Sequence, residues 1–301
     1  MKYLLLFAII ISSFLTNGNV HAKDEQSYKL LVLNTWMIPF LRKMPKTRSV
    51  LIGKNSQDYD FVMFQEVFGR RQRKLITRHI NRGEDRFYNR YQTTPFAKIN
   101  SGLFNHSKFR IISSSFKRFS RCGGAQCWSG KGLLHTRVRL ADGSEMDIYN
   151  THLQPFGSET KLREHQMGEI LEHIERTNGA ERPAILTGDF NISGGGSEYV
   201  TVNERLNLNG FFDAWTTLNQ NDPGYTWDSN INTWSQKTDN GYTSQHRFDY
   251  IYVRDGKNKK FDLLKSEVVF DEPKSITPTS KKYFLADHFG VDLTFKLYSD
   301  D

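Results

Sequence analysis

Seven short apolar runs, each rich in β-branched and aromatic residues, constrain the fold of this chain more than any other feature of its sequence. Runs of this kind, bounded by polar or glycine-containing turns, are typical of strands. They occupy residues 29–36, 61–67, 132–140, 146–153, 183–190, 247–254 and 289–297. The chain has 301 residues and is 38% hydrophobic, which is enough for a large core and favours one large domain over two.

Fewer segments have the periodicity of helices. Apolar residues recur at helical spacing within residues 159–179, and the stripe consists of Leu162, Met167, Ile170, Leu171 and Ile174. A second helix is predicted over residues 70–81, and residues 219–244 are expected to form long surface loops. Because strands follow one another directly, with a hairpin turn at Asp142–Gly143, we expect two mostly antiparallel sheets packed face to face with helices outside, an α+β sandwich.

Residues 1–22 are predicted to be a secretory signal peptide. Lys2 precedes an apolar run at residues 3–15, and a polar stretch then ends at Ala22, which fits cleavage after that residue. A membrane anchor is the alternative, but the run is shorter than the roughly 20 residues that span a bilayer. The domain at residues 23–301 is therefore expected to be secreted or periplasmic.

Export would place the chain in an oxidising compartment. Cys122 and Cys127 are its two cysteines, and we expect them to pair across a short glycine-containing loop, with two free thiols as the alternative. The formal net charge of +8 falls to +7 without Lys2, because residues 1–22 contain no acid. A basic domain meets polyanions and anionic membranes more often, but the charge alone identifies no partner.

Six of the predicted strands end in, or lie next to, residues that can bind a metal ion or move a proton. These residues are Asn34, Glu66, Asn150, His152, Asp189, Asn191, Asp249, Asp287 and His288. At a single position, a turn-capping Asn or Asp or a hydrogen-bonded His is the ordinary explanation. Because the pattern repeats on six strands, we expect the side chains to converge at one edge of the sandwich.

The residue types at this edge indicate metal-assisted chemistry. Asn34, Glu66 and Asp287 offer hard oxygen ligands, which suit a magnesium-like ion that keeps several waters and binds a phosphate oxygen. Zinc fits this set less well. Two histidines with carboxylate neighbours can supply a general base for water and a general acid for the leaving oxygen. The combination predicts hydrolysis of a phosphodiester.

The order of the motifs resembles the endonuclease/exonuclease/phosphatase superfamily over about residues 28–297. The motifs are LNTW, FQEV, NTHLQ, GDFN, RFDYIYV and ADHFGV. The resemblance implies a four-layer α/β/β/α sandwich. Within the superfamily, the segments LNTWMIPF, KGLLHTRVRL, IYNTHLQ and GYTWD are most similar to neutral sphingomyelinases. This implies magnesium-dependent cleavage of sphingomyelin to ceramide and phosphocholine at a membrane surface, with Mn²⁺ or Co²⁺ as alternative ions.

The resemblance also implies roles for the residues at the strand ends. Glu66 is implied to be the principal metal ligand, with Asn34 beside it. His288 is implied to be the general base on water. Asp249 and Asp287 are implied to orient this histidine or to complete the metal site, and the sequence does not divide these roles between them.

Other residues are expected to contact the substrate. His152 is implied to donate hydrogen bonds to the phosphoryl oxygens or to protonate the leaving alkoxide. Asp189 and Asn191 are implied to position the attacking water and the phosphate, and Asn150 is expected to face the same edge. Lys131 stands where similar sphingomyelinases also carry lysine, so a contact with phosphate is expected, with a solvated turn lysine as the alternative.

Trp227 is expected to contribute an aromatic face to a choline head group, because quaternary ammonium ions bind such faces, although tryptophans more often simply pack.

Two other functions compete with a sphingomyelin phosphodiesterase. A secreted magnesium-dependent nuclease would explain the basic charge and shares GDFN. A non-catalytic binding protein would keep the fold as a scaffold. The expected partner is a phospholipid at a membrane surface, nucleic acid is less favoured, and a monomer is expected since no apolar stripe demands a partner.

Overall fold

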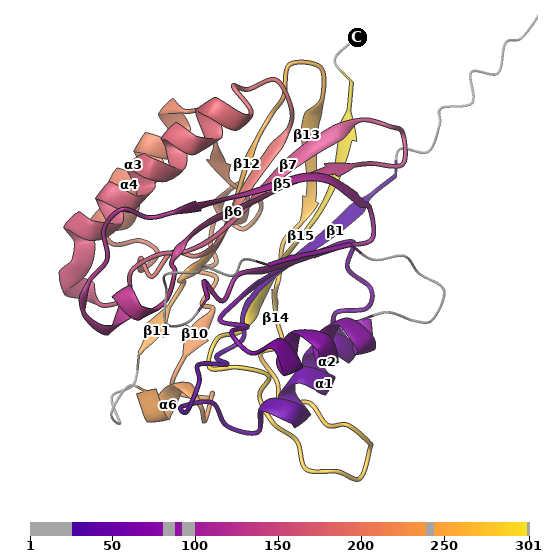
Figure 1. Ribbon diagram of the computed structural model, residues 1–301, viewed down its shortest axis with the longest axis vertical. Helices are drawn as coiled ribbons and strands as arrows, with labels where there is room; N and C mark the ends of the chain where they lie inside the picture. The colour runs from indigo at the N-terminus through magenta and orange to yellow at the C-terminus, as the bar shows by residue number, and fades with distance from the viewer. Residues whose placement is uncertain (1–25, 81–87, 92–99, 239–243, 300–301) are drawn as a thin grey trace, which may run out of the picture.

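The structure is a computed structural model and describes residues 26–80, 88–91, 100–238 and 244–299. The predicted signal peptide at residues 1–22 lies outside the described residues. Among the described residues, no helix is both long enough and apolar enough to cross a membrane. Figure 1 shows two sheets packed against each other, with helices on their two outer sides.

The first sheet brings together strands from both ends of the chain. Its order is β13-β15-β1-β2-β4-β3, and β14 also pairs with β15. The strands are β1 Tyr28–Asn34, β2 Phe61–Gln65, β3 Tyr88–Tyr91, β4 Phe104–Ser107, β13 Lys260–Lys265, β14 Val268–Val269 and β15 Gly290–Tyr298. Strands β1 and β2 are parallel, and the other pairs are antiparallel.

The second sheet is built from the middle of the chain, in the order β5-β6-β7-β8-β12-β9. Its strands are β5 Arg110–Arg118, β6 Gly132–Arg139, β7 Glu145–His152, β8 Ala184–Asp189, β9 Phe212–Asp213 and β12 Asp249–Arg254. Strands β7 and β8 are parallel, and the other pairs are antiparallel. A short separate ribbon pairs β10, Trp227–Asp228, with β11, Gln245–His246.

Helices α1 Pro45–Asn55 and α2 Arg70–Ile80 pack on the outer face of the first sheet, and α3 Thr160–Thr177 and α4 Ser197–Leu208 pack on the outer face of the second. The remaining helical segments are short: α5 Ala214–Leu218, whose Ala214 and Trp215 join the layer between the sheets, α6 Ser235–Thr238, and the 3₁₀ turns η1 Gly124–Trp128 and η2 Gly157–Glu159. Successive strand residues point to opposite faces, so each sheet contributes to two apolar layers. Val32 and Ile251 lie in the layer between the sheets. Leu51 and Ile76 pack on the first sheet, and Ile170 packs on the second.

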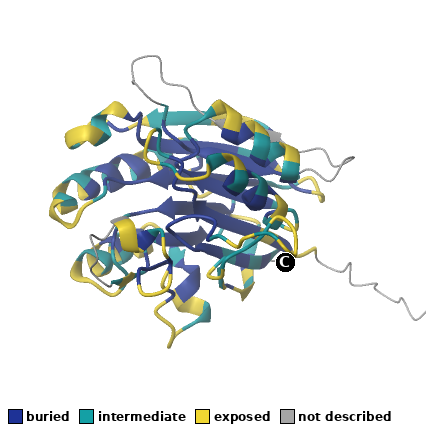
Figure 2. Cartoon of the chain, turned by 90° about the horizontal axis from the view of Figure 1, so that it is seen from below, coloured by how far each residue is buried: buried dark blue, intermediate teal, exposed yellow. Residues whose placement is uncertain are grey.

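The predicted α/β/β/α sandwich of two mostly antiparallel sheets is thus confirmed. Figure 2 shows the same layering as buried strands between helices whose outer faces are exposed. All seven predicted strands and both predicted helices are present within a few residues of their expected bounds. The hairpin turn between β6 and β7 places Gly143 at a φ of 87°, a conformation that glycine adopts without strain. The disulfide between Cys122 and Cys127 is also confirmed.

The expectation of surface loops over residues 219–244 is wrong in part. Thr226, Trp227, Ser229, Asn232 and Ser235 are buried. Their polar groups find partners inside the protein; the Asn232 amide, for example, donates to two backbone carbonyls of the last strand-end motif. The polar composition therefore predicted neither the short elements β10 and α6 nor this burial, which is possible because side-chain hydrogen bonds satisfy the buried polar groups.

Candidate active site

Three of the predicted site residues form one row across neighbouring strands. In the second sheet, His152 at the end of β7 is in register with Asp189 at the end of β8, which is in register with Asp249 at the start of β12. From the first sheet, the Asn34 amide reaches across and donates to Oδ2 of Asp189 over 2.9 Å. The two sheets therefore meet at this edge, as their strand ends predicted.

Asp189 is the centre of the cluster. Nε2 of His152 lies 3.4 Å from Asp189 Oδ2, and Nε2 of His288 lies 3.8 Å from the same atom. The backbone N–H of Asn191 donates to Asp189 Oδ1 over 2.8 Å, and Asn191 adopts a φ of 52°. Burial would raise the pKa of Asp189, but His152, His288 and the Asn34 hydrogen bond hold it below its ordinary value.

His288 is oriented by Asp249. Nδ1 of His288 lies 2.8 Å from Asp249 Oδ2, a distance that fits an Nδ1–H donor and leaves Nε2 facing the cluster. The hydroxyl of Thr226 accepts the backbone N–H of Asp249 over 3.2 Å and so fixes the start of β12. Burial lowers the pKa of His288, but Asp249 and Asp189 outweigh it and raise the pKa to about 10. This geometry favours the orienting role for Asp249.

Two further carboxylates at this edge lack full compensation. Glu66 follows β2 with a φ of 60°, and Asp287 precedes His288. Within the described part of the chain, Oε2 of Glu66 and Oδ1 of Asp287 are buried and have no hydrogen-bond partner. Burial, together with the charge of Asp287, raises the pKa of Glu66 to about 8. Burial also raises the pKa of Asp287 to about 6.

These orphaned oxygens are what a divalent cation would satisfy. Oδ1 of Asp249 is also buried without a partner among the described residues. Ligand atoms of Asp189, Asp249 and His288 lie within 4.8 Å of one another. A magnesium-like ion prefers oxygen ligands, and Nδ1 of His288 already contacts Asp249, so the oxygens of Asp189 and Asp249 suit such an ion better than this histidine does. Among the described residues, Glu66 and Asp287 lie outside this group, and each adds a buried carboxylate oxygen without a hydrogen-bond partner.

Asn34 occupies the expected place, but its amide oxygen is partly used. Oδ1 of Asn34 accepts the backbone N–H of Trp36 over 3.0 Å, while its nitrogen donates to Asp189. One lone pair of the oxygen stays available for an ion. Asn34 therefore holds Asp189 in place whether or not it also binds metal.

Lys131 lies inside the site and is not a solvated turn residue. It is buried, and its ammonium group donates to the carbonyl oxygens of Leu153 over 2.9 Å and of His152 over 3.4 Å. Burial lowers its pKa to about 8, against the opposing effect of Glu66 and Asp189.

Asn150 does not reach the site edge, which corrects the expectation that it contacts substrate. Its side chain is fully buried between the sheets. Its amide nitrogen donates to the carbonyl oxygen of Phe64 and to Asn105 Oδ1, and its oxygen accepts from Gln65 Nε2. Asn150 lies two residues before His152, about 7 Å deeper along the strand, where the opposite sheet covers it.

Trp227 is near the site but packs against His288. It is 8% exposed, and its ring meets the His288 ring edge-on, with centroids 5.1 Å apart. Its aromatic face is therefore largely covered by protein. The position next to His288 makes Trp227 a support for the ring that was expected to act as base.

Arg48 is a site residue that the sequence did not reveal. It is completely buried in α1, and its guanidinium donates to the carbonyl oxygens of Thr35, Trp36 and Leu285, over 2.7, 2.7 and 2.9 Å. Burial lowers its pKa to about 10, against the effect of Asp287 and Glu66. Arg48 ties the loop after β1 to the segment before Asp287. Helix α1 has no apolar stripe in the sequence, so no periodic signal pointed to it.

A pocket of about 420 Å³ opens beside the cluster. It is lined by Phe156, Gly157, Thr160, Arg163, Asn191, Ser193, Gly196, Ser197, Glu198, His246 and Phe248. Phe156 stands at its rim, 68% exposed and at a φ of 79°, an unusual conformation for a bulky residue. The aromatic side chains give the pocket an apolar wall next to Asn191.

The chain is similar in sequence to a known family. The profile of the Endonuclease/Exonuclease/phosphatase family matches residues 33–263. A sphingomyelinase of Mycobacterium tuberculosis is 28% identical over 120 residues, which are 40% of this chain and 24% of that protein. Sphingomyelinase C 1 of Leptospira interrogans is 30% identical over 127 residues, 40% of this chain and 21% of that protein. The matches thus span about a quarter of the length of these relatives, or less.

Solved structures share the fold over nearly the whole chain. Beta toxin from Staphylococcus aureus superposes with a TM-score of 0.73 at 22% identity, covering 91% of this chain and 100% of that chain. A beta toxin variant with bound magnesium ions gives 0.70 at 20%, covering 91% and 100%. TDP2 from D. rerio, complexed with a single-strand DNA product, gives 0.68 at 18%, covering 90% and 100%. At these identities the likeness establishes the fold.

Proposed function

Because the chain belongs to the Endonuclease/Exonuclease/phosphatase family, we propose that it is a metal-dependent phosphodiesterase that hydrolyses sphingomyelin to ceramide and phosphocholine. The observation that carries the proposal is the set of buried, uncompensated carboxylates beside an oriented histidine. Such a set destabilises a protein unless a cation or substrate uses it. Functional sites are where strongly perturbed pKa values gather.

Glu66, Asp287 and Asp189 are proposed to hold the ion, with magnesium the favoured metal and Mn²⁺ or Co²⁺ as alternatives. When bound, the ion would polarise a phosphoryl oxygen and offset the carboxylate charge that keeps His288 protonated. A magnesium-bound beta toxin variant of the same fold supports the choice of metal. Magnesium is expected to raise the melting temperature of wild-type protein by a few degrees and to leave the Glu66→Gln variant unchanged. Equal shifts in both proteins would argue against Glu66 as a ligand.

His288 is proposed to take the proton from the attacking water. Asp249 holds Nδ1, so Nε2 is the nitrogen available to the water. The new bond joins the water oxygen to phosphorus, the bond from phosphorus to the ceramide oxygen breaks, and the departing ceramide oxygen takes a proton from solvent water. Trp227 packs against the ring and limits its rotation.

The remaining residues are proposed to bind the phosphate as charge develops on it. Burial, with a smaller effect of Lys131, lowers the pKa of His152 to about 3, so its ring is neutral at neutral pH. A neutral imidazole donates a hydrogen bond but not a full proton to an alkoxide. His152 is therefore assigned the donor role and not the role of general acid. Lys131 and Asn191 lie at the same edge to stabilise the phosphoryl oxygens.

Sphingomyelin is preferred as substrate for two reasons. The curated relatives that match are sphingomyelinases, although the match covers only part of their length. The pocket beside Asn191 also has Phe156 and Phe248 in its wall, and aromatic faces bind quaternary ammonium groups. We propose that choline enters this pocket, in place of the Trp227 face expected from the sequence.

The decisive experiment uses residues 23–301 with magnesium or with EDTA. Phosphocholine release is measured from vesicles of sphingomyelin and, separately, of phosphatidylcholine. His288→Ala is expected to lower the rate about 10²- to 10⁴-fold, whereas His165→Ala, a partly exposed histidine on α3, serves as the matched control. Magnesium-dependent release that needs His288 supports the proposal. Absence of turnover on every phosphodiester tested would favour a non-catalytic scaffold.

A nuclease is the second candidate, because TDP2 with bound DNA product shares the fold and the chain is basic. Cleavage of plasmid DNA that is lost in Glu66→Gln, without phosphocholine release, would establish it. We also propose that the mature chain is exported and acts at a membrane surface. The amino-terminal sequence of protein recovered from the culture medium tests it, and a start near Lys23 is expected.

A further inference from the structure

A second pocket is lined in part by Lys131 and by three further cationic side chains. Its volume is about 330 Å³, and it is lined by Lys117, Arg118, Phe119, Ser120, Arg121, Cys122, Ser129 and Lys131. Four of these side chains are cationic and none is acidic. Glu169 pairs with Lys117 across 3.0 Å, and the buried Lys131 ammonium donates to the carbonyl oxygens of Leu153 and His152. Arg118 and Arg121 are therefore the lining cations that remain for a ligand.

The pocket shares a wall with the candidate active site. Lys131 lines it and is 5% exposed, and the same side chain feels the charges of Glu66 and Asp189. A group bound in the pocket would therefore contact a residue that also belongs to the candidate active site.

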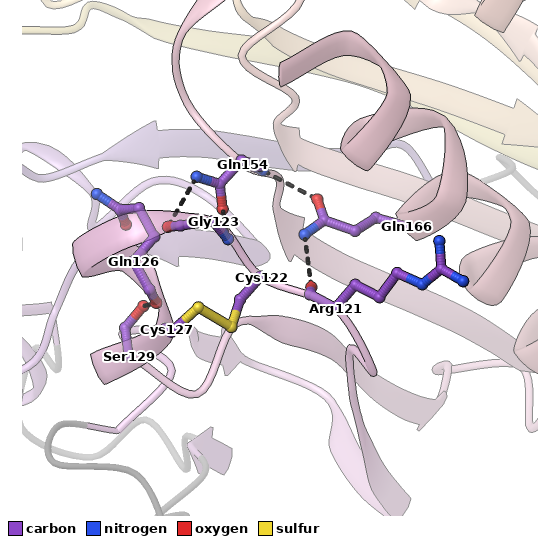
Figure 3. The surroundings of a disulfide bond; sticks show 8 residues. All are labelled: Arg121, Cys122, Gly123, Gln126, Cys127, Ser129, Gln154 and Gln166. Atoms are coloured by element: carbon purple, nitrogen blue, oxygen red, sulfur yellow. Dashed lines mark hydrogen bonds between the residues drawn. A yellow bond between two sulfur atoms is a disulfide. The ribbon is translucent and has the colours of Figure 1, made fainter. Parts of the chain in front are cut away.

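The loop that forms the pocket is held in place. Figure 3 shows the disulfide between Cys122 and Cys127 closing the loop, with Gln154 and Gln166 facing it. The Gln154 side chain exchanges two hydrogen bonds with the backbone of Gly123, and Gln166 donates to the carbonyl oxygen of Arg121. The backbone that carries Arg121 is thus set before any ligand arrives.

An exposed tryptophan adjoins the same loop. Trp128 ends the 3₁₀ turn that follows Gly123 and is 55% exposed. Arg118 and Arg121 are exposed as well, and within the described chain neither forms an ion pair with a carboxylate. Tryptophan favours the head-group level of a bilayer, and arginine there binds anionic lipid phosphates.

We propose that this pocket binds the phosphate of an anionic phospholipid, and that it docks the enzyme on the membrane beside the lipid being cleaved. The suggestion that docking serves catalysis rests on the proposed lipid substrate. The binding itself is independent of catalysis, so it is measured on vesicles without sphingomyelin and in EDTA. Trp128 favours a lipid over a nucleic acid as the source of the phosphate.

The test compares binding of the full mature chain to vesicles of phosphatidylcholine, with and without phosphatidylserine. The double substitution Arg118→Gln with Arg121→Gln is expected to weaken binding to the anionic vesicles roughly 10- to 30-fold. The matched control is Arg110→Gln with Arg139→Gln. These exposed arginines pair at the other end of the β5–β6 ladder, so the net charge changes equally. Trp128→Ala is expected to weaken binding to both vesicle types.

Three results would overturn the proposal. Equal losses in the two double variants would show a general effect of charge. Equal binding of the wild-type protein to vesicles with and without phosphatidylserine would show that the pocket has no anionic lipid as its ligand. If the variant with Arg118→Gln and Arg121→Gln loses binding to single-stranded DNA or to inorganic phosphate but still binds vesicles, the pocket takes its phosphate from a different source. A failed phosphodiesterase assay would not by itself affect any of these outcomes.

Discussion

Strand β7 has a buried carboxylate cluster at each end, and the two clusters are built in opposite ways. Near its start, Asp147 accepts hydrogen bonds from His135, Arg137, Asn178 and Arg182. Beyond its end, the Glu66–Asp287 group has buried oxygens without partners among the described residues. The first cluster is complete as it stands, and the second is complete only with a ligand.

The pKa values follow the same division. Burial would raise the pKa of Asp147, but the hydrogen bonds from His135 and Arg137 hold it well below its ordinary range. Burial, followed by the charge of Asp287, raises the pKa of Glu66 to about 8, against a smaller opposing effect of Lys131. A structural carboxylate is stabilised by fixed cations, whereas a functional one keeps its affinity for a mobile cation.

The largest expected difference between the clusters is in catalysis. Glu66→Gln should lower magnesium-dependent phosphocholine release about 1,000-fold, because several kcal/mol of transition-state stabilisation depend on the ion. Asp147→Asn should leave the rate per folded molecule within a few-fold of wild type. Glu172→Gln, an exposed glutamate on α3, is the control. Comparable losses of the rate of phosphocholine release in the Glu66 and Asp147 variants would show that the two clusters do not differ in function.

Stability should respond in the reverse order. Asp147→Asn is expected to lower the free energy of unfolding by about 3 kcal/mol, since it leaves Arg137 and Arg182 beside a neutral group. In EDTA, Glu66→Gln is expected to be as stable as wild type or more stable, because it removes a buried charge with no compensation. Urea denaturation of both variants measures this. A clear destabilisation by Glu66→Gln in EDTA would contradict the assignment.

The clusters should also differ in the sign of their pH dependence. The raised pKa of Glu66 means that, without metal, the folded state binds its proton more tightly, so wild type should lose stability relative to Glu66→Gln between about pH 5 and 8. The slope is at most about 1.4 kcal/mol per pH unit. The depressed pKa of Asp147 stabilises the fold above about pH 4, and this contribution is lost as pH falls further. Parallel profiles of wild type and Glu66→Gln would refute the first part.

The smallest expected effect concerns the support of the histidine. Trp227→Phe keeps an aromatic ring against His288 but removes part of the contact, so kcat should fall about 2- to 10-fold with KM nearly unchanged. Phe156→Ala should instead raise KM for choline lipids, since Phe156 lines the proposed choline pocket. A KM effect of Trp227→Phe larger than its kcat effect would restore Trp227 as a choline contact.

Local patterns in the sequence were sufficient for the architecture. Alternation and apolar runs identified β1, β7, β8 and β12, because a strand buried on both faces needs a nearly continuous run of such residues. The polar residues that interrupt these runs then located the site edge. Edge strand β5 was missed, since its serines carry no apolar signal, and α1 was missed because it buries an arginine.

The sequence by itself determined where seven of the strands lie along the chain, the edge at which they end and the residue types that gather there, because these depend on residue type and short-range periodicity. The tertiary structure decided which polar residues lie at the site edge, which of them support others there and which lie in the core. Asn150 and His152 share a strand face, but the opposite sheet covers only Asn150. Arg48 and Trp227 acquire their places through contacts made across the chain. Depth and partners arise from packing, and neither is written in local spacing.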